Sequence, residues 1–122
     1  MSRGYKRETE GFVLADATAT AKTIGDEPFQ FFSKFPDVCV AVDANRRNGI
    51  LQLMQHKPDV ILLDDAFQHR KVKAGLYVLL TTHDELFCDD YILPFGNLRE
   101  PAFGKKRANM IIVTKCPATI SE

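Results

Sequence analysis

At 122 residues, with 45% hydrophobic and 26% charged residues, the sequence has the size and composition of one soluble globular domain at most. Lys plus Arg equals Asp plus Glu at 16 each, which excludes a general polyanion binder and leaves nucleic acid unexpected as a partner. No run of about 18 apolar residues and no signal-peptide pattern occurs, so neither a membrane span nor secretion is predicted. Three scattered cysteines without a CxxC pair favour reduced thiols over a disulfide framework or a zinc site.

The chain opens on a basic loop and a short strand. Met1-Ser2-Arg3-Gly4-Tyr5-Lys6-Arg7 gathers cationic side chains around a glycine, a combination suited to an anion, although a solvated terminus explains the same composition. Residues 12–14 predict a strand, and the small polar residues 16–22, which lack a hydrophobic period, predict a loop.

Ile24-Gly25-Asp26-Glu27-Pro28 predicts the start of a helix. Acids and proline are favoured in a first helical turn, and phenylalanines at positions 29, 32 and 35 give the helix one apolar face. On this pattern alone, the commonest role of Asp26 is that of an N-cap.

The central part of the chain has the pattern of a parallel sheet. A strand at 38–42, a helix with polar start at 43–47 running to His56, and a strand at 60–63 form a βαβ unit in under 30 residues. Further apolar strands are predicted at 76–81 and 110–114, separated by a long aperiodic stretch of the kind that is usually functional or a covering loop. The predicted fold class is therefore α/β with a mostly parallel sheet, as a single domain over 1–122, which the resemblance described below makes a partial one.

The apolar run Val60-Ile61-Leu62-Leu63 ends directly in Asp64-Asp65. Ligand crevices of parallel sheets open at the carboxyl ends of strands, so this is the arrangement of a Walker B motif, whose acids hold the magnesium of a nucleotide. The alternative is a strand that ends in two solvated acids.

A Walker B strand implies a phosphate-binding loop of the form GxxxxGK[ST], and these 122 residues contain none. The one Gly-Lys pair is Gly104-Lys105, where Lys106 stands in place of Ser or Thr and Glu100 in place of the first glycine. No GxGxxG occurs either, so the sequence carries one half of a nucleotide site.

Five stretches in this order resemble one family, the tetraacyldisaccharide 4'-kinases of lipid A biosynthesis. They are Ser2-Arg3-Gly4-Tyr5, Gly25-Asp26-Glu27-Pro28, Asp64-Asp65-Ala66-Phe67-Gln68-His69-Arg70, Leu93-Pro94 with Leu98-Arg99-Glu100-Pro101, and Ile111-Ile112-Val113-Thr114-Lys115. Each stretch alone is a weak signal. Together they are specific, because they occur in register over nearly the whole chain.

The resemblance implies a P-loop NTPase-like α/β fold, here incomplete because the Walker A strand and loop are absent. It implies transfer of the γ-phosphoryl group of ATP to the 4'-hydroxyl of a lipid A disaccharide precursor, with Mg²⁺ as cofactor. It also implies work at the cytoplasmic face of the inner membrane, reached through regions outside this chain.

Carried over residue by residue, the resemblance assigns metal binding to Asp64 and Asp65 and the role of catalytic base to Asp26. It assigns substrate contacts to Tyr5, Arg46, Gln68, His69, Arg99 and Glu100. Ala66 departs from the family's frequent glycine, and Phe95 and Asn97 replace its usual Ala and Pro.

The family has a membrane-associating helix and a P-loop before Ser-Arg-Gly-Tyr, and a further region after the last strand. We therefore expect an internal fragment that is inactive by itself. Two other interpretations stay open. One is a non-catalytic binding module that retains the sugar and phosphate surface, and the other is an α/β domain whose acids are helix caps and strand ends.

Overall fold

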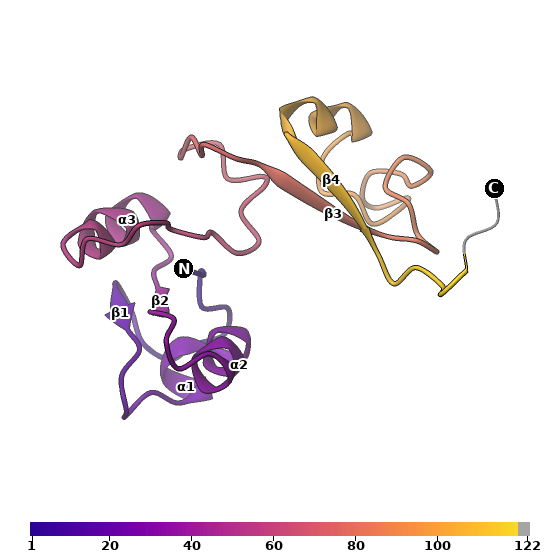
Figure 1. The fold of residues 1–122 in the computed structure, drawn as a ribbon. Helices are drawn as coiled ribbons and strands as arrows, with labels where there is room; N and C mark the ends of the chain where they lie inside the picture. Colours follow the sequence, from indigo (N-terminus) through magenta and orange to yellow (C-terminus); the bar gives the residue numbers. More distant parts are fainter. Residues whose placement is uncertain (120–122) are drawn as a thin grey trace. The chain divides into compact units, whose positions relative to one another are not determined.

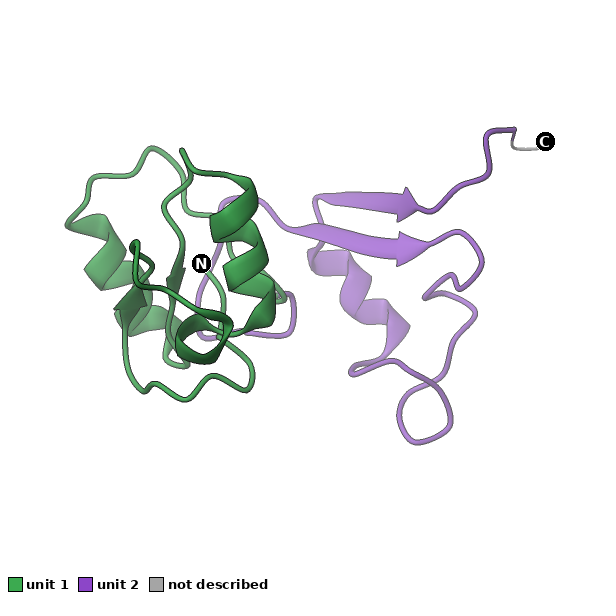
Figure 2. Cartoon of the chain, turned by 90° about the horizontal axis from the view of Figure 1, so that it is seen from below, with its two compact units in different colours: residues 1–66 green, residues 67–122 purple. Residues whose placement is uncertain are grey.

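The computed structural model describes residues 1–119 (Figure 1), and its chain divides into two compact units, residues 1–66 and 67–122 (Figure 2).

The first unit packs three helices around a short antiparallel sheet. Its elements are β1 (Val13–Leu14), α1 (Ala21–Ile24), α2 (Asp26–Lys34), β2 (Ala41–Val42) and α3 (Arg46–Met54). The strands pair Val13 with Val42 and Leu14 with Ala41. Its buried apolar core consists of Ile24, Val40, Ala41, Val42 and Leu53. Apolar burial of this kind is the main force that stabilises the unit.

The predicted helices from 26 and from 43–47 are confirmed as α2 and α3. The predicted loop over 16–22 is wrong at its end, because α1 begins there. Thr20 caps it in a reciprocal arrangement with Thr23, in which each side chain accepts a hydrogen bond from the other residue's backbone amide. This capping box was missed because Thr replaces the Glu or Gln that usually marks it.

The strand predicted at 60–63 is wrong as a regular element. Residues 60–63 have no assigned secondary structure, and the side chains of Val60 and Leu62 are 72% and 76% exposed. Among the hydrogen bonds of the described residues, this segment pairs with Met1: the Met1 amino group donates to the Leu62 carbonyl at 2.7 Å, and the Asp64 amide donates to the Met1 carbonyl at 3.0 Å. A single paired residue does not make a β-ladder, but it ties the main chain of Leu62 and Asp64 to Met1.

Ser2 continues this pairing toward the sheet. Its amide donates to the Ala41 carbonyl at 3.0 Å, and its own carbonyl accepts from the Asp43 amide at 3.1 Å. The first two residues of the chain therefore lie between β2 and the segment that leads into Asp64 and Asp65.

The second unit contains the parallel pair β3 (Val78–Thr82) and β4 (Met110–Thr114), and the 3₁₀ helix η1 (Ala102–Arg107). The register runs from Val78 opposite Met110 to Thr82 opposite Thr114, which confirms parallel pairing of these two predicted strands. The prediction of a mostly parallel sheet holds here, whereas β1 and β2 are antiparallel. Helix η1 was not predicted, since its basic, glycine-containing sequence has no amphipathic period.

Candidate functional site

The acid pair Asp64-Asp65 forms a turn in the first unit that is braced by Arg46. Arg46 is 6% exposed, and its Nη2 atom donates to the main-chain carbonyls of Asp64 at 3.0 Å and Asp65 at 2.8 Å. Its Nε atom is buried without a hydrogen-bond partner. Asp65 has φ of 43°, in the left-handed region that Asp tolerates better than most residues. The turn therefore fixes the backbone of both carboxylates.

Charges of both signs surround this turn. Burial lowers the pKa of Arg46 from its ordinary value, and Arg3 acts in the same direction, whereas the carboxylates of Asp65 and Asp64 act to raise it. A guanidinium that is desolvated in this way interacts strongly with an anion that reaches it, since water no longer screens its charge.

A further buried acid, Asp43, follows β2 and was not singled out from the sequence. It is 2% exposed, and its carboxylate accepts from the Asn45 amide at 2.8 Å and from the Asn48 side-chain amide at 2.7 Å. The signal that could have found it is its position directly after an apolar run of residues, a position that Asp64 shares. Asp43 fixes the start of α3, the helix that begins at Arg46.

The loop of Ser2 to Tyr5 lies against the junction between α1 and α2. Gly25 has φ of 91°, and a Cβ there would lie 3.0 Å from the Tyr5 carbonyl oxygen. Gly4 is also in a positive-φ conformation, at 71°. Glycine is therefore required at position 25 both for its backbone conformation and for the approach of the loop. The structure thus brings the backbone of Tyr5 close to the residue that precedes Asp26.

The N-cap role considered for Asp26 is wrong. Gly25 is the N-cap of α2 and makes no side-chain cap hydrogen bond, so Asp26 is the first helical residue and its side chain is exposed. Tyr5 is 73% exposed, with Lys6 Nζ 5.4 Å from the centre of its ring. Arg7 donates to the carbonyls of Val42 and Gly11, which ties it to the fold of this unit.

The remaining predicted site residues lie in the second unit. Gln68 and Arg99 are exposed, His69 is intermediate in burial, and the Glu100 side chain is 16% exposed. Glu100 accepts from Arg107 at 2.6 Å and from Arg70 at 3.3 Å. The hydrogen bond from Arg107 lowers the pKa of Glu100, and the bond from Arg70 has a smaller effect in the same direction. Burial acts to raise this pKa, but the two arginines outweigh it.

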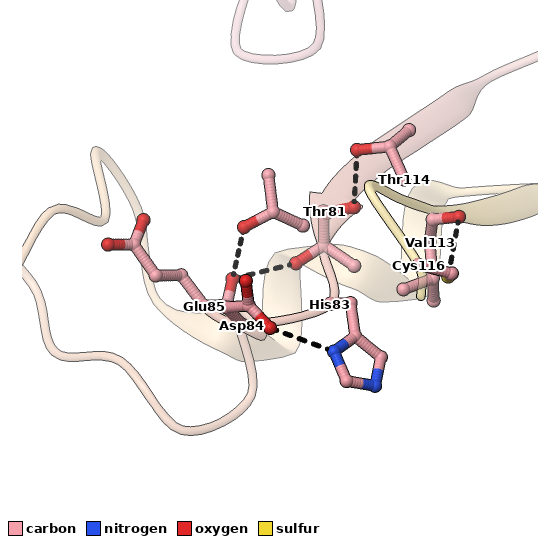
Figure 3. Close-up of polar contacts among 8 residues, drawn as sticks. Thr81, His83, Asp84, Glu85, Val113, Thr114 and Cys116 are labelled. Carbon is pink, nitrogen blue, oxygen red and sulfur yellow. Dashed lines mark hydrogen bonds and ion pairs between the residues drawn. The ribbon is translucent and has the colours of Figure 1, made fainter. Parts of the chain in front are cut away.

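The second unit also has a cavity of about 300 Å³ beside the end of β3. It is lined by His83, Asp84, Glu85, Leu86, Asp89, Asp90 and Asn97. Figure 3 shows part of this region: His83 Nδ1 lies 2.9 Å from an Asp84 carboxylate oxygen, and the hydroxyl of Thr81 donates to the Glu85 carbonyl at 3.1 Å. None of the residues predicted from the sequence to form the site lines this cavity.

A complete metal cage does not occur in the described part of the chain, where no three His, Cys, Asp or Glu side chains gather as ligands. An acid pair is still a suitable donor set for Mg²⁺, which keeps several waters and usually takes one or two carboxylates together with phosphate oxygens. Cys39, Cys88 and Cys116 are free thiols. None of the helices within residues 1–119 has the length and apolar character needed to cross a membrane.

Comparison with known proteins gives one consistent family. Residues 1–122 match the family described as LpxK, Tetraacyldisaccharide-1-P 4'-kinase. The Tetraacyldisaccharide 4'-kinase of Flavobacterium johnsoniae is 65% identical over 124 residues, covering 100% of this chain and 36% of the relative. That of Bacteroides fragilis (strain ATCC 25285) is 59% identical over 123 residues, covering 98% of this chain and 33% of the relative.

The fold is similar to a solved structure of the same family. It matches the crystal structure of the "apo" form of LpxK from Aquifex aeolicus in complex with ATP with a TM-score of 0.83 and 36% sequence identity. The match covers 93% of this chain and 37% of that structure. The chain therefore spans about a third of the length of the relatives that it matches.

Proposed function

The chain belongs to the tetraacyldisaccharide-1-P 4'-kinase family, and we propose from this that it is part of an ATP-dependent lipid A kinase. The reaction proposed is transfer of the γ-phosphoryl group of ATP to the 4'-hydroxyl of a lipid A disaccharide precursor. We propose further that both units belong to one P-loop NTPase-like domain, which works at the cytoplasmic face of the inner membrane through regions outside these residues.

The observation that carries the proposal is the braced acid turn within a chain matched by the family over its whole length. Arg46 donates hydrogen bonds to the main-chain carbonyls of Asp64 and Asp65. The backbone that carries the two carboxylates is therefore held in place before any ligand binds. Charges held in fixed positions stabilise the transition state of phosphoryl transfer, in addition to the positioning of the reacting groups. Bound Mg²⁺ would neutralise charge on the phosphate oxygens, and Asp64 and Asp65 would hold it.

On the substrate side, we propose that Tyr5, Arg46, Gln68, His69, Arg99 and Glu100 contact the sugar and its phosphate, and that Asp26 accepts the proton of the attacking hydroxyl. An arginine fork meets phosphate oxygens through two hydrogen bonds, which suits Arg99 to a substrate that carries a phosphate. The side chains of Tyr5, Gln68 and Arg99 are exposed, so a ligand in solution can reach them.

The test uses a chimaeric kinase in which these 122 residues replace the matching segment of the Flavobacterium johnsoniae relative, which is 65% identical to them. We expect the chimaera to transfer phosphate from ATP to a tetraacyldisaccharide 1-phosphate in detergent micelles at a rate near that of the relative. An inactive but folded chimaera would contradict the proposal.

The 122-residue chain by itself should show no such turnover. It contains no GxxxxGK[ST] loop to hold the β- and γ-phosphates, and positioning supplies most of the rate in phosphoryl transfer. Turnover by the isolated chain would overturn this part of the proposal. Binding of the disaccharide by a chimaera that cannot transfer phosphate would instead support the binding-module alternative.

A further inference from the structure

Arg107, at the end of η1, contacts two of the segments that carry proposed substrate residues. Its Nη2 atom donates to Glu100 Oε1 at 2.6 Å and to the main-chain carbonyl of Phe67 at 3.2 Å. Its guanidinium also lies over the ring of Phe67, 4.7 Å from the ring centre. One side chain therefore joins the residue before Gln68 and His69 to the residue after Arg99.

The pairing of Arg107 with Glu100 is less exposed than the ion pair that Arg70 makes with the same carboxylate. The side chains of Glu100 and Arg107 are 16% and 29% exposed, whereas that of Arg70 is 69% exposed. Solvent screens the exposed pair, so Arg107 is the partner that fixes the Glu100 carboxylate.

Gly104 makes the approach of these two side chains possible. A Cβ at position 104 would lie 2.8 Å from Glu100 Cδ and 3.2 Å from Arg107 Nη1, so any larger residue would press on the pair. The Phe67 ring is held from another direction by Tyr77, which packs edge-on at 6.2 Å between ring centres. The Arg107 contacts thus lie within a packed cluster whose geometry depends on the small size of residue 104.

We propose that Arg107 is a positioning residue of this kinase, which orients the Phe67 to His69 segment and the Arg99-Glu100 loop toward the phosphorylated disaccharide. The inference rests on the proposed function, because it takes Gln68, His69 and Arg99 as substrate contacts. Lysine is a poor substitute at this position, since it is a flexible point charge without the planar guanidinium that stacks on a ring while its fixed donors meet neighbouring oxygens.

The test compares Arg107→Lys with Lys106→Gln in the chimaeric kinase. Lys106 is the exposed neighbour of Arg107 in the same helix and serves as the control. We expect Arg107→Lys to raise KM and the measured Kd for a tetraacyldisaccharide 1-phosphate by on the order of 10-fold, as for loss of other supporting contacts around a site. The KM for ATP should change less than twofold, and Lys106→Gln should leave all three values unchanged.

Two further variants separate positioning from general stability. Gly104→Ala leaves every charge in place but crowds the Glu100–Arg107 pair, so it should raise the KM for the disaccharide. If Arg107 and Glu100 act as one unit, Arg107→Lys should have a smaller effect in a Glu100→Gln background than in the wild type, because that background has already lost the ion pair. An equal rise in both KM values, or a lower melting temperature without a change in disaccharide affinity, would overturn the proposal. The Kd measurement needs no turnover, so it tests Arg107 even if the chimaera fails to transfer phosphate.

Discussion

The guanidinium of Arg46 donates a 2.8 Å hydrogen bond to the main-chain carbonyl of Asp65. Asp65 has a left-handed backbone, and the same Nη2 atom also bonds the carbonyl of Asp64. The resemblance assigned Arg46 to the substrate, and the structure gives it a second role as the brace of the acid turn. Because its Nε atom is buried and unpaired, Arg46 also retains a donor with no partner among the described residues.

We therefore expect Arg46→Lys to destabilise the acid turn. An ammonium lacks the planar fork of the guanidinium, and loss of a hydrogen bond from a charged donor costs about 1.5–3 kcal/mol. In the chimaeric kinase, urea denaturation should detect a loss of this size, together with reduced turnover. The control is Arg47→Lys, since Arg47 is exposed in the same helix. Equal stability of the two variants would contradict the bracing role.

Replacing the acids tests the metal site directly. Asp64→Asn and Asp65→Asn should each lower kcat by about 100-fold or more, since each removes a charge that would hold Mg²⁺ near the transferred phosphate. Asn tolerates positive φ, so Asp65→Asn changes the charge without straining the turn. The exposed Asp59→Asn is the control. Ordinary activity in both site variants would return Asp64 and Asp65 to the alternative of solvated acids.

The sequence predicted α2, α3 and the β3–β4 pair because hydrophobic spacing along each segment is a local property, whereas α1 and η1 were missed. The sequence did not predict that residues 60–63 form no regular strand. An apolar run becomes a strand only where a neighbouring segment pairs with it over several residues, and here Met1 supplies one paired residue. Burial of Asp43 was also missed, because its partners Asn45 and Asn48 are recognised only once α3 has formed.

The proposed site residues come from a different route, the motif resemblance, and the structure adds what several of them contact. The motif identified Glu100, but its pairing with Arg107 depends on the backbone of η1 and on the space that Gly104 leaves. The contacts of Arg107 join residues that lie seven and 40 positions apart in the sequence. No periodic pattern in the sequence indicates such pairs. The motif resemblance therefore proposes site residues, whereas the contacts that hold them are seen only in the structure.

The Glu100 carboxylate gives a test that depends on pH. Its folded-state pKa is lowered below the ordinary value of 4.5, first by the Arg107 hydrogen bond, so its stabilising effect is present above that value. The effect is lost as the pH falls below 4.5 through the folded-state pKa, where the carboxyl is protonated in both states. Hydrogen bonds to a charged group of this kind contribute about 1–3 kcal/mol.

Urea denaturation of the chimaera and of its Glu100→Gln variant measures this contribution. The stability difference should be largest at neutral pH and should shrink as the pH falls below 4.5. Arg70→Gln should have a smaller effect, because its side chain is 69% exposed. A difference that stays constant or grows toward acid pH would show that Glu100 does not stabilise the protein as an anion.

Asp26 is the proposed catalytic base, and its position in α2 allows a controlled test of that role. It is the first residue of the helix, Gly25 is the cap, and Glu27 is the second acid of the same turn. Both acids interact favourably with the positive end of the helix dipole, which is worth about 0.3–1 kcal/mol each. Asp26→Asn and Glu27→Gln should therefore lower stability by similar small amounts.

Their effects on catalysis should differ. A sugar hydroxyl is a poor nucleophile, and a carboxylate that accepts its proton as the bond to phosphorus forms contributes roughly 100- to 10,000-fold. In the chimaeric kinase, Asp26→Asn should lower kcat by that factor with the KM for ATP and the Kd for the disaccharide nearly unchanged, whereas Glu27→Gln should keep its turnover. If Asp26→Asn retains most of its turnover, as Glu27→Gln is expected to, then Asp26 serves the helix and the base lies elsewhere.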